Sequence, residues 1–181
     1  MPTAAQYEKQ IRSLRRPGLL ALWRQIKAGT TPGWDPGKAL EYLVVRAFEL
    51  EKATVVYPYE VRDGRLTIEQ IDGVVYLDHL TCLLESKDRG KPLDHDPLAD
   101  LRDQLQRRPP SVIGCCASAS GFTLNARKRA VLAAPQRILL WEATEIEYAL
   151  TKGRMCRGLH AKYRHCVERA MPDFNIEAAK I

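Results

Sequence analysis

The sequence is most informative at first through what it lacks. It has no apolar run approaching the ~18 residues of a bilayer-spanning helix, which excludes such a segment. Its first sixteen residues contain no apolar stretch of the secretory-signal kind. The five cysteines are an odd number and include the adjacent pair Cys115 and Cys116, which does not suit a disulfide framework. Internal repeats and low-complexity tracts are also absent. These absences predict a reduced, cytoplasmic globular protein.

Charge is unevenly distributed along the 181 residues, whose net charge is +6. Residues 1–30 contain six Lys or Arg and one acid, and residues 151–169 repeat those numbers. The segment between them is slightly acidic. Basic flanks around an acidic centre suit a metal site that also binds a polyanion such as nucleic acid. The alternative is that the flanks are merely solvated helix faces.

Hydrophobic periodicity predicts alternating helices and strands. The first helical segment is expected to break at Pro17-Gly18, and residues 29–37 form a turn-rich loop. The last core helix is expected to open at Thr144, with Glu147 completing a capping box. Helices are predicted over residues 4–28, 38–52, 97–108, 125–134 and 144–150. Strands are predicted over residues 54–61, 67–77, 80–87, 111–120 and 137–143. This order predicts an α/β fold, with a mixed central sheet flanked by helices.

Three charged residues lie in or next to apolar strands, where unpaired charge is costly. Asp72 interrupts the strand 67–77, and Glu85 and Lys87 end the strand 80–87. Residues i and i+2 share a face of a strand, so Glu85 and Lys87 point the same way. If the two strands pair as a hairpin, Asp72 falls near Glu85. The alternative is a surface ion pair on an edge strand.

Two carboxylates beside one ammonium group suit the hydrolysis of phosphodiesters. Mg²⁺ prefers carboxylate oxygens and retains several waters, and Mn²⁺ is expected to substitute for it. Asp72 and Glu85 are therefore predicted as metal ligands, with the backbone carbonyl of Ser86 as a third. Lys87 is predicted to position the attacking water or to stabilise charge on the phosphate.

The segments Gln70-Ile71-Asp72-Gly73 and Glu85-Ser86-Lys87 resemble the signature of Mrr-like restriction endonucleases, which belong to the PD-(D/E)xK superfamily. The resemblance extends over residues 37–150, where it implies a nuclease core of order αβββαβ. It also implies Mg²⁺-dependent cleavage of DNA, most simply duplex DNA. Residues 1–36 would then be a helical appendage and residues 151–181 a basic helical extension.

The family's first helix often places a glutamate at the site, which makes Glu41 a further candidate catalytic residue and metal ligand. The alternative is a solvent-facing Glu41 at the helix start. Glu69 is three residues before Asp72, but strand alternation predicts that it faces the opposite way. A role in defence against foreign DNA and a homodimer with two related sites are also expected.

The basic helix predicted over residues 152–169 is expected to contact nucleic-acid phosphates. Its candidate contacts are Arg154, Arg157, Lys162, Arg164 and Arg169. Cys156 and His160 have a spacing that one zinc site could use, but the other spacings match no familiar zinc pattern. Two alternative functions remain open, namely an inactive nucleic-acid-binding module of the same fold and a nuclease that acts on RNA.

Overall fold

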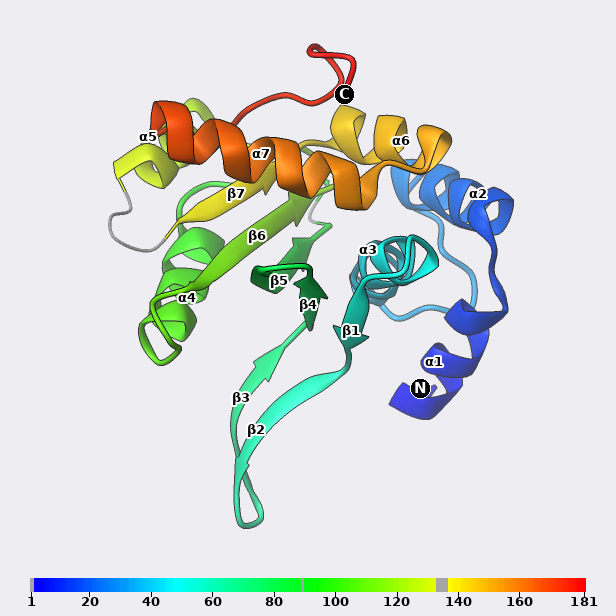
Figure 1. Ribbon diagram of the computed structural model, residues 1–181. Helices are drawn as coiled ribbons and strands as arrows, with labels where there is room; N and C mark the ends of the chain where they lie inside the picture. The colour runs from blue at the N-terminus through cyan, green and yellow to red at the C-terminus, as the bar shows by residue number, and fades with distance from the viewer. Residues whose placement is uncertain (1, 89, 133–136) are drawn as a thin grey trace.

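The computed structural model describes residues 2–88, 90–132 and 137–181, and Figure 1 shows their arrangement. A five-stranded sheet has the order β1-β4-β5-β6-β7. Neighbouring strands are antiparallel from β1 to β5 and parallel from β5 to β7. The bounds are β1 Thr54–Val56, β4 Gly73–Leu77, β5 Leu80–Lys87, β6 Val112–Ser118 and β7 Ile138–Trp141. The predicted mixed sheet is confirmed.

Helices cover both faces of this sheet, because its central strands are apolar on both sides. Cys82 and Leu84 of β5 pack into one core with the side chains of α3 (Lys38–Leu50), α6 (Ala143–Lys152) and α7 (Met155–Arg169). Leu83 faces the other way, into a core formed with α4 (Asp96–Gln106) and α5 (Leu124–Leu132). The prediction of flanking helices is therefore also confirmed.

Two predicted strands are each divided in the structure. Residues 67–77 break at Asp72 into β3 (Leu66–Ile71) and β4, and residues 54–61 break at Tyr57-Pro58 into β1 and β2 (Tyr59–Asp63). Proline has no N–H for a strand ladder, which explains the second break. The strands β2 and β3 pair only with each other. They form a two-stranded arm that projects from the sheet (Figure 1).

Helix boundaries also differ from the prediction. The first helical segment breaks between α1 (Ala4–Ser13) and α2 (Arg16–Lys27), so Pro17 lies in the first turn of α2, where its missing N–H costs little. The capping box of α6 uses Glu142 and Glu145 in place of the predicted Thr144 and Glu147. Residues 133 and 134, the predicted end of the helix 125–134, lie outside the described residues. Among the described helices, none has the length and apolar character that a bilayer crossing requires.

The side chain of Lys162 is fully buried, although it was predicted to contact phosphate. Its Nζ donates to Glu145 Oε1 at 2.6 Å and to the backbone oxygen of Phe174 at 2.5 Å. It also lies 5.2 Å from the ring centroid of Trp141. A lysine without exposed surface cannot reach a phosphate, so this part of the prediction is wrong. Lys162 instead holds the C-terminal segment against α6 and α7.

Candidate functional site

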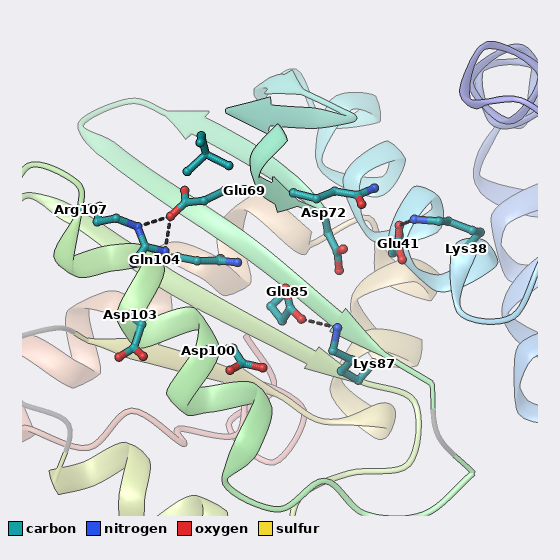
Figure 2. A pocket seen from close by; sticks show the side chains of 12 residues that line it. Lys38, Glu41, Glu69, Asp72, Glu85, Lys87, Asp100, Asp103, Gln104 and Arg107 are labelled. Atoms are coloured by element: carbon teal, nitrogen blue, oxygen red, sulfur yellow. Dashed lines mark hydrogen bonds and ion pairs between the residues drawn. The ribbon is translucent and has the colours of Figure 1, made fainter. Parts of the chain in front are cut away.

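A pocket of about 590 Å³ opens where the end of β5, the start of α3, the base of the arm and one face of α4 meet (Figure 2). Most of the side chains that line it are charged or polar. They are Lys38, Glu41, Ile68, Glu69, Gln70, Asp72, Glu85, Lys87, Asp100, Asp103, Gln104 and Arg107. The pocket therefore contains all of the predicted catalytic side chains.

Asp72 occupies the single position between β3 and β4. Because Gly73 pairs with Leu84, Asp72 lies beside the end of β5, where its Oδ2 accepts a hydrogen bond from the backbone N–H of Ser86 at 2.6 Å. Gly73, the next residue, lets α3 pack closely against the start of β4, since an added Cβ would lie only 2.9 Å from Cγ2 of Val45 on α3. The hairpin predicted to bring Asp72 to the Glu85 end of its partner is thus present.

Glu85 and Lys87 project from the same face of β5 as Leu83, which is the face that α4 covers. The ammonium group of Lys87 forms an ion pair with Glu85, and Figure 2 shows Asp72 and Glu85 projecting into the same space. The Glu85 side chain is only 9% exposed. Two carboxylates and one ammonium group therefore meet at one wall of the pocket, where Glu85 is buried and Asp72 and Lys87 are partly buried.

Carboxylate charge exceeds the nearby positive charge in this place. Burial, followed by the charges of Glu85 and Glu41, raises the pKa of Asp72 to about 8, against smaller opposing effects of Lys87 and the Ser86 N–H. Burial also raises the pKa of Glu85, although Lys87 opposes it. The pKa of Lys87 is raised: burial lowers it, but the attraction of Glu85 and Asp72 outweighs that effect. An additional cation would relieve this excess of negative charge.

Glu41 lies in the first turn of α3 and lines the pocket. Its carboxylate accepts a hydrogen bond from Lys38 Nζ at 2.6 Å, and the Glu41 side chain is 17% exposed. The structure therefore places Glu41 at the pocket and not on the outer face of the helix. Its role as a metal ligand stays a prediction.

Glu69 also lines the pocket, contrary to the expectation that it would face away. The alternation of strand faces is interrupted at Asp72, so it cannot be counted across the break from β4 to β3. The Glu69 carboxylate is bound by two arginines just beyond the end of α4: Arg107, and Arg108 at 2.6 Å. These ion pairs join the arm to α4.

One face of α4 supplies a wall of the pocket that the sequence analysis did not assign. Asp100, Asp103, Gln104 and Arg107 recur at helical spacing and all line it. The side-chain oxygen of Gln104 is buried and has no hydrogen-bond partner among the described residues. The sequence does show a stripe of polar residues at helical spacing within residues 100–107. The stripe alone does not indicate whether it faces a pocket or bulk solvent.

The donor atoms suit Mg²⁺, although no ready-made metal centre is present. In the described part of the chain, no three His, Cys, Asp or Glu side chains are grouped so that they could hold a metal ion. Mg²⁺ commonly uses one or two carboxylates and completes its coordination with water and substrate oxygens. Asp72, which is half-buried, and Glu85, which is buried, are short of positive charge and fit that requirement.

The predicted phosphate contacts on α7 are not brought to this pocket, since none of them lines it. Helix α7 covers the face of the sheet opposite α4. Arg157, Arg164 and Arg169 are exposed and Arg154 is partly buried, so a contact with nucleic acid stays a prediction for these four.

The cysteine and histidine side chains of α7 have separate environments. His160 bonds to Asp78 at 2.8 Å, and His165 stacks on Phe174. Cys156 lies near backbone oxygens of Phe48 and Glu51. Zinc binding at Cys156 and His160 therefore gains no support from the structure.

No family model and no curated protein matches this sequence. Among solved structures, the small subunit of the heterodimeric restriction endonuclease R.BspD6I is similar, with a TM-score of 0.55 and 14% identity over 91% of this chain and 94% of that one.

Two further structures have lower TM-scores. The protein of unknown function AF1548 has a TM-score of 0.43 and 17% identity over 73% of this chain and 67% of that one. The DNA modification-dependent restriction endonuclease AspBHI has a TM-score of 0.40 and 11% identity over 88% of this chain and 41% of that one. The similarity to the small subunit of R.BspD6I shows that the fold of this chain is restriction-endonuclease-like.

Proposed function

We propose that this protein is a Mg²⁺-dependent endonuclease of the PD-(D/E)xK, Mrr-like type, with duplex DNA as its substrate. The observation that supports this most directly is the meeting of Asp72, Glu85 and Lys87 in one pocket of a restriction-endonuclease-like fold. The pairing of Gly73 with Leu84 brings Asp72 to the other two residues. A role in defence against foreign DNA belongs to the same proposal.

Asp72, Glu85 and the backbone carbonyl of Ser86 would hold the metal ion, with Glu41 close by. When bound, Mg²⁺ supplies a Lewis acid for the phosphate and lowers the pKa of a water molecule. The chain's own contribution begins with Ser86, whose N–H fixes one oxygen of Asp72 and so orients the other. The buried surroundings strengthen every charge interaction in the pocket.

Lys87 has two tasks in this proposal. In the free protein its ammonium group neutralises Glu85. In the complex it donates hydrogen bonds to a non-bridging phosphate oxygen, where negative charge grows during hydrolysis. Its raised pKa keeps it protonated at neutral pH, which both tasks require. The Lys87 side chain is 27% exposed and is thus accessible from the pocket.

The proposal is tested by incubating purified protein with supercoiled plasmid and Mg²⁺ or Mn²⁺. We expect Asp72→Asn and Lys87→Ala each to lower the nicking rate at least about a hundredfold, the effect typical of a lost electrostatic contact to the transition state. Asp78→Asn is the matched control, because Asp78 lies in the exposed turn between β4 and β5 and outside the pocket. Equal nicking by all variants would show that the activity comes from a contaminant.

An inactive nucleic-acid-binding module is a second candidate, and one observation favours it. Lysines already pair with Glu85 and Glu41, and the described residues offer no group of three metal ligands. This candidate predicts salt-sensitive binding without turnover in Mg²⁺ or Mn²⁺. Digestion of duplex DNA, single-stranded DNA and RNA side by side would also separate a DNA nuclease from an RNA nuclease.

A homodimer is proposed because two symmetry-related sites suit the cleavage of two strands. Light scattering after size-exclusion chromatography, with and without a short duplex, would measure the mass of the complex. A single chain per duplex would contradict this part of the proposal.

A further inference from the structure

A second cavity of about 240 Å³ adjoins the candidate active site. The two share four lining residues, Lys38, Glu41, Gln70 and Asp72. The N-terminal part of α1, the loop before α3 and the base of the arm form its other walls. A ligand that places a phosphate beside Asp72 would therefore have its neighbouring groups at the entrance of this cavity.

Aromatic side chains form part of the walls of this cavity, whereas none lines the first pocket. Tyr7, Tyr42 and Tyr57 line it, and each is at most 8% exposed. Trp34 stacks behind Tyr7, with ring centroids 5.1 Å apart and planes 7° from parallel. Tyr42 meets Tyr57 edge to face, at 5.6 Å and 78°. Such packing holds the rings in fixed orientations, so the cavity is a rigid aromatic chamber.

The charges around the chamber exclude phosphate and favour hydrogen-bond donors. Asp35, Glu41, Glu60 and Asp72 line it together with one cation, Lys38. A phosphate group would be repelled by the surplus of carboxylates. An uncharged planar ring with N–H groups would instead pack against the parts of the tyrosine rings that reach the cavity and donate to carboxylate oxygens. Nucleobases combine these two properties.

We propose that this cavity binds one unstacked nucleobase of the nucleotide next to the phosphate held at Asp72. The inference rests on the proposed function and narrows its substrate class. The protein would act on nucleic acid in which one base is unpaired or is easily turned out of the helix. Turning a base out of a helix costs the free energy of unstacking and unpairing it, and that cost is smallest at mismatched or single-stranded positions.

The experiment compares the loss of binding caused by an abasic site in the wild-type protein with the loss in variants of the cavity. Labelled oligonucleotides carry an abasic site at each position in turn, and their binding is measured by fluorescence anisotropy in Ca²⁺, another hard cation that carboxylate oxygens bind. The oligonucleotide is recovered afterwards to verify that it is uncut. With the wild-type protein, we expect one position at which the abasic site weakens binding about 5- to 150-fold, the effect of one base stacked on aromatic rings.

Two variants alter the chamber in different ways. Ala4 is exposed and lines the cavity, so Ala4→Trp adds bulk there, whereas the neighbouring Ala5 is exposed and does not line it. Ala5→Trp is therefore the matched control. Tyr42→Leu removes one aromatic wall. In Ala4→Trp and Tyr42→Leu we expect weaker binding of the intact oligonucleotide and no further loss from the abasic site, whereas Ala5→Trp should behave as wild type.

A spectroscopic measurement needs no variant. The fluorescent base 2-aminopurine, placed at the sensitive position, should be quenched when wild-type protein binds, because it stacks on the tyrosines. The inference is overturned if the wild-type abasic scan is flat, or if neither variant changes the penalty of the abasic site. A flat scan together with Mg²⁺-dependent cleavage would contradict the base-binding cavity and leave the proposed nuclease function intact. A position-dependent abasic penalty that the variants abolish, without any cleavage, would support the base-binding cavity and contradict the proposed nuclease function.

Discussion

Replacement of Asp72 by asparagine should make the metal-free protein more stable at alkaline pH. The carboxyl has an ordinary pKa of 3.8 and a pKa of about 8 in the folded protein, chiefly because of burial and then because of Glu85 and Glu41. In the unfolded chain it ionises near pH 4. Between pH 4 and pH 8 the folded state therefore binds more protons, and the free energy of unfolding falls as pH rises.

The magnitude follows from the difference between the two pKa values. Moving a carboxyl pKa from 3.8 to about 8 corresponds to roughly 6 kcal/mol of preference for the protonated form in the folded protein. Asparagine does not ionise and escapes this loss, while its side-chain oxygen can still accept from Ser86 N–H. The free energy of unfolding of the Asp72→Asn variant should match that of the wild type near pH 4 and exceed it by up to about 6 kcal/mol above pH 8.

Urea denaturation at pH 4.5, 6.5 and 8.5, with chelator present, measures the difference directly. Glu168→Gln serves as the control, because the Glu168 side chain on α7 is exposed and lies outside the pocket, so its replacement should produce no such trend. Under the proposed function, Mg²⁺ added at pH 8.5 should then stabilise the wild type and leave Asp72→Asn unchanged, because the proposed ligand Asp72 is absent from the variant. If the gap between variant and wild type did not widen with pH, the excess of negative charge inferred for this pocket would be refuted.

Two further predictions concern the elements that support the site. Lys162→Ala should lower the free energy of unfolding by about 3–5 kcal/mol, because it leaves Glu145, whose side chain is 1% exposed, as an uncompensated buried charge. The double variant Lys162→Met, Glu145→Gln should recover most of that loss, as measured by thermal unfolding. Gly73→Ala should cost about 1–3 kcal/mol in urea denaturation and slow cleavage, because its Cβ would press on Val45 and displace Asp72; stability and nicking rate equal to those of the wild type would contradict the close approach of α3 to β4.

Local sequence patterns were sufficient to predict the centre of the site. The alternation of side chains along a strand placed Glu85 and Lys87 on one face of β5, and the short turn after β4 brought Asp72 to them. Both relations depend on residues close in sequence. The mixed sheet and its flanking helices followed from the order of apolar segments, which is also a local property.

The remaining features depend on contacts between distant segments. The segment 67–77 divides at Asp72 between two sheets, and apolar residues occur on both sides of that break, so the arm was not predicted. The burial of Lys162 could not be predicted from a basic helix, because it requires Glu145 and Phe174 on other segments. The polar face of α4 could not be assigned to the site from the sequence either, because it lines the pocket only through its packing against distant segments.

The junction of the arm with the sheet has a mechanical consequence. Asp72 alone connects β3 to β4, so the arm cannot tilt without rotating the backbone that carries this carboxylate. The ion pairs of Glu69 with Arg107 and Arg108 fix the tilt from the opposite side. A nucleic acid that displaced the arm would therefore also move the carboxylate of Asp72. The position of Asp72 would then depend on whether nucleic acid contacts the arm.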